Sequence, residues 1–205
     1  MRLYILLAAG LLTLVCSCAP TSSPPQAAAR RDKELAVKEN KKYHVRCVFY
    51  GEEVEAGAGR TAKVVRYVAL KNESGDEARY APADAAAAGD SDIYFTDVWS
   101  PDEEYLVLPR GRFEGFCIMK APGAFESVKA GRCDDFIRVR EKNGTSLWHE
   151  FVGWGGGLLT FKAGLSGDSF TFRYDLTSRS LTTSERPIPS VEGENGAGKL
   201  IVGAN

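Results

Sequence analysis

The strongest constraint on this chain is a series of short β-type runs, separated by turn signals, that begins at Tyr43. Residues 44–50 alternate between apolar and polar, which places Val45, Cys47 and Phe49 on one face of a strand. Further runs rich in β-branched, aromatic and aliphatic residues are expected to form strands at 63–70, 93–99, 105–109, 113–120, 136–140, 146–151, 158–163, 170–176 and 181–183. About ten short strands at such intervals are typical of an all-β sandwich or barrel.

Turn-forming residues connect these runs. The sequence Ser100-Pro101-Asp102-Glu103 and the pair Arg110-Gly111 separate 93–99, 105–109 and 113–120, so we expect a three-stranded antiparallel meander there. The pair Asn143-Gly144 favours a tight turn and predicts a hairpin between 136–140 and 146–151. Residues 177–180 are expected to turn the last pair of strands, and a helix is expected only around residues 124–130.

Two stretches, residues 94–119 and 148–183, are similar to each other. The first contains Trp99-Ser100-Pro101-Asp102 and then Tyr105-Leu106-Val107-Leu108. The second contains Trp154, then Leu158-Leu159-Thr160-Phe161 and Tyr174-Asp175-Leu176. With these motifs, both stretches resemble blades of TolB-type β-propellers. The resemblance concerns local structure and implies no particular activity.

A blade takes about 40 residues, so residues 43–189 supply fewer than four blades and a closed ring is not expected. The predicted fold is therefore all-β. Antiparallel meanders and hairpins pack as a sandwich, or as an incomplete propeller-like pair of sheets, with at most one short helix.

The N-terminal segment has the pattern of an export signal. Met1-Arg2 carries one positive charge, and the thirteen residues 3–15 are almost wholly apolar. As a helix this run would span about 20 Å, whereas the hydrocarbon core of a bilayer is about 30 Å thick. The run is therefore too short for a stable transmembrane anchor and fits the apolar core of a signal peptide.

The run ends in Val15-Cys16-Ser17-Cys18, which resembles the lipobox of bacterial lipoproteins. The resemblance implies cleavage before Cys18 and attachment of lipid to that cysteine. Ala19 follows, where no aspartate stands, and by the same resemblance this implies sorting to the outer membrane. One alternative is that Cys16 is the lipidated residue, although Val15 would then occupy a cleavage site that normally holds a small residue. The other is an ordinary secretory signal with two incidental cysteines.

This pattern divides the chain into four parts. Residues 1–17 are the predicted signal peptide, and residues 18–42 a lipidated, flexible, charged tether. Residues 43–189 form the predicted all-β domain, and residues 190–205 a disordered, glycine-rich tail. Within the tether, residues 30–42 are interpreted as a solvated spacer, with a short fraying helix or contact with anionic lipid head groups as alternatives.

Three cysteines remain after export and lipidation. In an oxidising compartment we expect one disulfide and one odd thiol. The preferred pair is Cys117 with Cys133, which closes a short loop and stabilises by roughly 3 kcal/mol on the chain-entropy model. Cys47 is expected to pack on the apolar face of its strand. No close Cys or His pair suggests zinc, and no metal is predicted.

No catalytic residue is assigned from the sequence. His149 is expected on the strand face opposite Trp148, toward solvent, and its spacing from Ser166 and Asp168 does not support a triad. Ser166 also lacks the Gly-x-Ser-x-Gly frame of a nucleophile elbow and is interpreted as a turn residue. The other histidine, His44, begins a strand.

A second motif matches most of a phosphate-binding loop, in residues 193–199. Leu200 stands where a Ser or Thr hydroxyl is required, so no nucleotide is expected and the match is interpreted as coincidence in the tail. The formal net charge of −1 gives no global positive field, so no nucleic acid is expected either. No cofactor is predicted.

Acidic clusters and aromatic residues are the remaining candidates. The acidic clusters lack a calcium-loop pattern and are interpreted as solvated loops, although a carboxylate pair for glycoside cleavage stays open. These clusters are Asp84, Asp90 and Asp92; Asp102, Glu103 and Glu104; and Asp134 with Asp135. The aromatic residues form a candidate ligand platform beside three glycines, or alternatively fill a sheet-on-sheet core. They are Trp148, Phe151 and Trp154.

The leading prediction is an envelope-anchored lipoprotein whose β-domain binds a protein or a cell-wall component without catalysis. Its partners would be the membrane, through the lipid on Cys18, and an envelope protein or wall ligand. Two alternatives belong to other classes. One is a hydrolase of wall glycan or peptide that uses carboxylates, and the other is a small lipoprotein inhibitor that protects the cell from an attacking enzyme.

Overall fold

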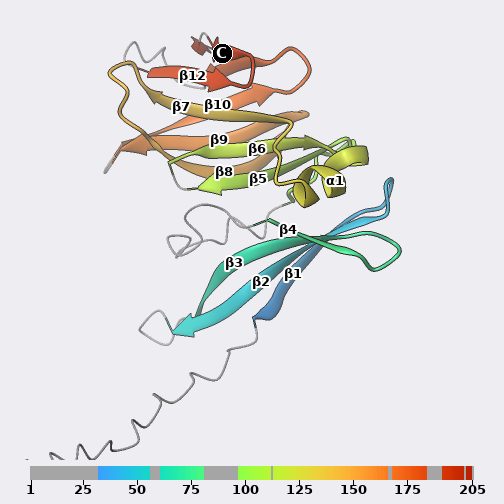
Figure 1. Cartoon of the computed structure of the whole chain (residues 1–205). Coiled ribbons are helices and arrows are strands. Elements are labelled where there is room, and N and C mark those ends of the chain that lie inside the picture. Colours follow the sequence, from blue (N-terminus) through green and yellow to red (C-terminus); the bar gives the residue numbers. More distant parts are fainter. Residues whose placement is uncertain are drawn as a thin grey trace, which may run out of the picture. The chain divides into compact units, whose positions relative to one another are not determined.

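The computed structural model describes residues 32–55, 61–80, 97–111, 113–165, 168–183, 191–200 and 202–204. These residues form three sheets, in which all but one of the strand pairings are antiparallel, and one short α-helix (Figure 1). The all-β prediction is confirmed. Within the described ranges, no helix has both the length and the apolar character needed to cross a membrane.

The first four strands form sheet A, a simple meander. Its strands are β1 (Lys33–Asn40), β2 (Val45–Glu55), β3 (Thr61–Lys71) and β4 (Glu77–Tyr80), in that order. The alternation predicted for β2 is confirmed, because Val45, Cys47 and Phe49 all lie in one buried cluster. Edge strand β1 carries four charged residues in Lys33–Asn40, a composition that discourages pairing with another chain.

Sheet B has the order β13-β12-β7-β6-β5, and all of its pairings are antiparallel. Its strands are β5 (Tyr105–Gly111), β6 (Gly115–Lys120), β7 (Asp135–Glu141), β12 (Val191–Asn195) and β13 (Gly198–Leu200).

Sheet C has the order β14-β11-β10-β9-β8, and only its β11–β14 pairing is parallel. Its strands are β8 (Trp148–Gly155), β9 (Leu158–Leu165), β10 (Asp168–Asp175), β11 (Ser180–Thr183) and β14 (Val202–Ala204).

The β5–β6 hairpin of sheet B is buried on both faces. One face joins the cluster that contains the inner side chains of sheet A, through Leu106, Leu108, Cys117 and Met119. The other face joins the cluster with sheet C, through Val107, Phe116 and Ile118. Each of these side chains is at most 3% exposed. Since side chains alternate along a strand, this double burial makes β5–β6 the layer between the other two sheets.

A short helical segment follows β6. A 3-10 turn at Ala121–Gly123 has Pro122 in its first turn, where the missing N–H costs nothing, and leads into α1 (Ala124–Lys129). The helix buries Ala124 and Val128 in the same cluster as sheet A. The helix predicted around residues 124–130 is confirmed.

Polar contacts attach β1 and the turn after it to the segment before β5. The buried Asn40 side chain donates to the Glu103 carbonyl oxygen over 2.8 Å and accepts from the Tyr43 N–H over 3.0 Å. The Trp99 indole donates to the Lys38 carbonyl oxygen over 3.2 Å. An unpaired buried amide would cost about 1–3 kcal/mol. Moving sheet A along sheet B would break these bonds and incur that cost, so they favour the observed position.

The structure corrects two predicted boundaries. Residues 33–40, assigned to the flexible tether, form strand β1, because Leu35 and Ala36 pack against the core while Lys33 and Glu34 before them remain exposed. Residues 191–195, 198–200 and 202–204, assigned to a disordered tail, form β12, β13 and β14.

The inward positions of β12 hid the strand pattern from sequence reading. They are Val191, Gly193 and Asn195, of which only the first is a large apolar residue. Gly193 allows close packing, since a Cβ atom there would lie 2.5 Å from Leu181 Cδ2 and that side chain would have to shift. The buried Asn195 amide donates to the Tyr174 hydroxyl over 2.9 Å. A glycine and a satisfied amide therefore replace the expected apolar residues.

Two local pairing predictions are also wrong or incomplete. The turn at Asn143-Gly144 is present, with Gly144 at φ 91°, but the strands on either side belong to different sheets and share only the bridge between Arg140 and Ser146. The described part of the meander predicted from residue 93 consists of the β5–β6 hairpin and an antiparallel bridge between Trp99 and Leu106. Residues 93–96 lie outside the described residues.

We predict that the Cys47 thiol resists alkylation in the folded protein. Its side chain is 0% exposed, and burial raises the pKa of the thiol well above its usual range, so almost no thiolate is present. Mass spectrometry after iodoacetamide treatment should show label at Cys47 only when denaturant is added. Rapid labelling without denaturant would contradict the packing of β2 against sheet B.

Candidate functional site: an arginine-lined cleft

A cleft of about 570 Å³ lies where β4, the β5–β6 hairpin and α1 meet. Pockets of a few hundred cubic ångströms are the usual size for a small ligand or a few residues of peptide. Its walls come from separate parts of the chain and include three arginines and one glutamate. The lining residues are Arg79, Tyr80, Arg110, Glu114, Val128, Gly131, Arg132 and Cys133.

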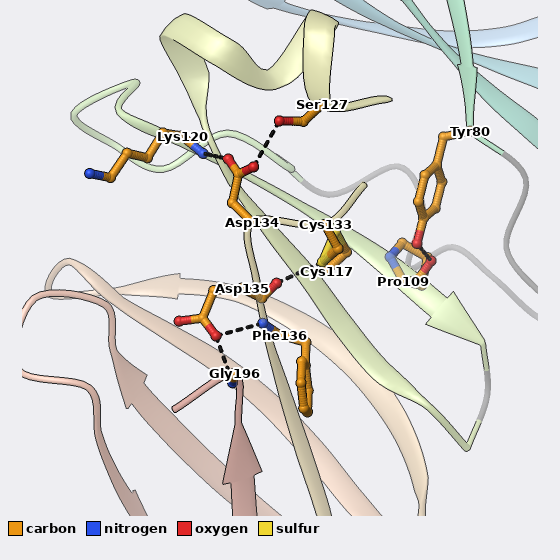
Figure 2. The surroundings of a disulfide bond; sticks show 10 residues. All are labelled: Tyr80, Pro109, Cys117, Lys120, Ser127, Cys133, Asp134, Asp135, Phe136 and Gly196. Atoms are coloured by element: carbon orange, nitrogen blue, oxygen red, sulfur yellow. Dashed lines mark hydrogen bonds between the residues drawn. A yellow bond between two sulfur atoms is a disulfide. The ribbon is translucent and has the colours of Figure 1, made fainter. Parts of the chain in front are cut away.

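A disulfide holds one wall of this cleft. Cys117, fully buried on β6, is bonded to Cys133 on the segment between α1 and β7, with a Cα–Cα distance of 5.6 Å (Figure 2). The predicted pair Cys117–Cys133 is confirmed. Because Arg132 and Gly131 directly precede Cys133, the bond fixes the backbone that carries them into the cleft.

Two neighbouring carboxylates secure the same segment from opposite sides, as Figure 2 shows. Asp134 accepts the Lys120 N–H over 3.1 Å and the Ser127 hydroxyl over 2.7 Å, which ties the segment to β6 and α1. Asp135 accepts the Phe136 and Gly196 N–H groups, each over 2.8 Å, which ties it to the β12–β13 turn.

The pair Asp134–Asp135 is therefore a structural support: Asp134 is exposed, as the prediction of a solvated loop requires, whereas Asp135 is not. The side chain of Asp135 is only 16% exposed. The two carboxylates also point apart, and no group of three or more potential metal ligands occurs in the described part of the chain.

Two of the cleft arginines are fixed by aromatic rings. The Arg110 guanidinium lies over the Phe136 ring, 4.9 Å from its centroid, and that of Arg79 lies over Tyr67 at 4.8 Å. Stacking holds a guanidinium plane while leaving its in-plane N–H donors available. Arg79 also donates a hydrogen bond to Glu77, with the Nε–Oε1 distance at 2.7 Å. This bond lowers the pKa of Glu77.

The charges around the cleft do not cancel. Glu77 compensates Arg79, and Glu114 is itself bound by Arg138, with the Nη1–Oε2 distance at 3.2 Å. Arg110 and Arg132 have no carboxylate within ion-pair distance among the described residues. The cleft is thus a positive spot on a chain whose formal net charge is −1.

The predicted aromatic platform is not assembled. Phe151 is buried and Trp154 packs beside it with ring centroids 6.4 Å apart, both against the core between sheets B and C. Trp148 lies on the other face of β8 and donates to the Leu165 carbonyl oxygen. A bulge between Phe151 and Gly153 reverses the alternation and turns Trp154 inward. The alternative prediction, that these aromatic residues fill the core between two sheets, is therefore right for Phe151 and Trp154.

The two histidines lie in different surroundings. His149 faces the interior rather than solvent. Its Nε2 accepts the Val139 N–H over 2.8 Å, and its ring meets Phe116 edge to face. The face of β8 that carries Phe151 is the buried one, which explains the error. His44 is exposed beside Glu73.

Several other candidates have clear outcomes. The loop that resembles a phosphate-binding motif is a hairpin turn between β12 and β13, and the Gly196 N–H is occupied by Asp135. Asp102 organises the turn before β5 by accepting from Ser100 and from the Glu104 N–H. Cys18 and Ser166 lie outside the described residues, as do Asp84, Asp90 and Asp92.

Comparisons of the chain with protein-family models, with curated proteins and with solved structures gave no match.

We predict that the double variant Cys117→Ala, Cys133→Ala unfolds about 3 kcal/mol more easily, because the bond closes a loop with a sequence separation of 16. Urea unfolding monitored by tryptophan fluorescence measures this change. The wild type should lose similar stability in reducing buffer, while the double variant should not respond to reductant. Equal stability of the oxidised wild type and the variant would contradict the role of this bond.

Proposed function

We propose that this protein is a lipoprotein of the bacterial cell envelope, and that its β-domain is a binding module without catalytic activity. The partner is an envelope protein or a wall component that presents negative charge. The observation that carries the proposal is the cleft in which Arg110 and Arg132 lack a carboxylate partner among the described residues.

The anchor rests on the resemblance of Val15-Cys16-Ser17-Cys18 to a lipobox after a short apolar run. Each buried methylene of an acyl chain contributes about 0.8 kcal/mol, so several chains on Cys18 give lasting attachment where one would not. Ala19 favours the outer membrane as the destination. An anchored domain meets its partners at high local concentration, so modest affinity at the cleft is sufficient for function.

The cleft suits recognition rather than chemistry. Guanidinium groups donate fixed, planar pairs of hydrogen bonds to carboxylates or phosphates, and they do not exchange protons at physiological pH. Among the described lining residues there is no nucleophile with an adjacent base, and the Tyr80 hydroxyl donates to the Pro109 carbonyl oxygen over 2.9 Å. The ring stacking of Arg110 adds the preorganisation that improves affinity by lowering the entropy lost on binding.

We expect Cys18→Ala to abolish lipid attachment and release the protein from the membrane fraction. Cells grown with a labelled fatty acid, fractionated by centrifugation and probed for the protein, provide the measurement. Cys16→Ala is the matched control and should remain labelled and membrane-bound. Unchanged processing and location of Cys18→Ala, with no acyl label on the wild type, would contradict the proposed anchor.

The binding function is tested with the mature chain in detergent micelles, using wall sedimentation and cross-linking to envelope proteins as two arms. In at least one arm, we expect the wild type and the Arg173→Gln control to be retained equally. The double variant Arg110→Gln, Arg132→Gln should be retained about tenfold less, or weaker still. Arg173 is an exposed residue of β10 outside the cleft.

Equal retention of all three proteins, or retention of none, would contradict the proposed site. Release of soluble fragments from the walls, abolished by a substitution of a carboxylate or of His149, would instead establish the hydrolase alternative. Circular dichroism and urea unfolding of each variant ensure that a loss of binding is not a loss of fold.

A further inference from the structure

The electrostatic pattern of the cleft narrows the chemistry of its ligand. Arg110 and Arg132 line the cavity with no carboxylate of the described residues within ion-pair distance, whereas Arg79 is paired with Glu77. Two uncompensated guanidiniums in one cavity favour a ligand with two anionic groups over one with a single charge. A ligand with one carboxylate would leave the second arginine without a counter-charge.

The single acidic residue of the lining adds a second requirement. The Oε2 atom of Glu114 accepts a hydrogen bond from Arg138. Within the described residues, no hydrogen bond reaches its Oε1 atom. Its side chain is 43% exposed, so a ligand can approach that oxygen. A carboxylate oxygen accepts hydrogen bonds from N–H groups and repels phosphate oxygens. The ligand should therefore carry N–H donors close to its anionic groups.

The remaining lining is partly apolar. Val128 of α1, Tyr80 and Cys133 belong to the lining, and their apolar atoms make no strong hydrogen bonds. They suit the methylene and backbone atoms between charged groups. The volume of about 570 Å³ accommodates a few residues and not a folded domain.

We propose that the arginine-lined cleft binds a short acidic peptide segment, through two carboxylates held by Arg110 and Arg132 and a peptide N–H held by Glu114. This proposal rests on the binding function proposed above and specifies the chemical class of the partner. A peptide satisfies all three requirements together: it carries paired carboxylates, N–H donors and a largely apolar backbone. A phosphate ion or a phosphatidylglycerol head group supplies the anion without the N–H.

The test is isothermal titration calorimetry of the mature chain in detergent micelles. The probes are capped pentapeptides of glycine with two aspartate or glutamate residues, adjacent or separated by one or two residues. Each acidic peptide has a matched control peptide in which asparagine replaces aspartate or glutamine replaces glutamate. We expect at least one acidic peptide to bind, its amide counterpart to bind at least tenfold more weakly, and the affinity to fall as salt is added.

Three single variants assign the contacts. Arg110→Gln and Arg132→Gln should each weaken binding of the acidic peptide by roughly tenfold or more, and Arg173→Gln should leave it unchanged. Glu114→Gln should weaken binding of the acidic peptide. It should strengthen binding of inorganic phosphate, because the negative charge that repels phosphate is gone. A purely structural role for Glu114 would not produce this opposite response.

The outcomes separate this proposal from the function on which it rests. If no acidic peptide binds, but wall or protein retention still depends on Arg110 and Arg132, the peptide assignment is wrong and the binding function stands. Tighter binding of inorganic phosphate or of phosphatidylglycerol vesicles than of every acidic peptide overturns the assignment in the same way. If retention and peptide binding are both insensitive to the two arginines, both proposals fail.

Discussion

The burial of both faces of the β5–β6 hairpin is the constraint on which the rest of the domain depends. Leu106 and Leu108 pack toward sheet A, while Val107 between them packs toward sheet C. Replacing one such large side chain by alanine typically costs 2–5 kcal/mol, a large part of the stability of an ordinary domain. One hairpin thus holds two separate hydrophobic clusters together.

The position of the cleft follows from this arrangement. Arg79 and Tyr80 come from sheet A, Arg110 and Glu114 from the central hairpin, and Arg132 from the segment bonded to β6. These residues converge only because sheet A docks on the hairpin, where the Tyr80 hydroxyl reaches the Pro109 carbonyl oxygen. The proposed binding site is therefore a product of tertiary packing and not of any local motif.

Strong local signals in the sequence predicted their elements well. The alternation in residues 44–50 identified the buried face of β2, and the spacing of Cys117 and Cys133 identified the disulfide. Signals that depend on distant partners failed. The charged strand β1 forms because β2 offers it an edge, and β12 forms because Gly193 and Asn195 match Leu181 and Tyr174 on other strands.

The cleft itself could not be predicted, since nothing along the chain relates Arg79 to Arg132. One unused signal was the continuous apolar run in Tyr105–Leu108 and again in Phe116–Met119. A run without alternation is typical of a strand buried on both faces. It indicated a third layer, where only two sheets packed face to face had been expected. The bulge in β8 that turns Trp154 inward carries no such signal.

Native-state hydrogen exchange followed by NMR tests the central layer most directly. The backbone amides of β5 and β6 should be the slowest to exchange, with opening free energies equal to that of global unfolding. Amides of sheet A and of sheet C should exchange at or below that value. If the amides of β5 and β6 instead open more readily than those of both other sheets, the hairpin is not the layer that joins them, and the account of the cleft fails with it.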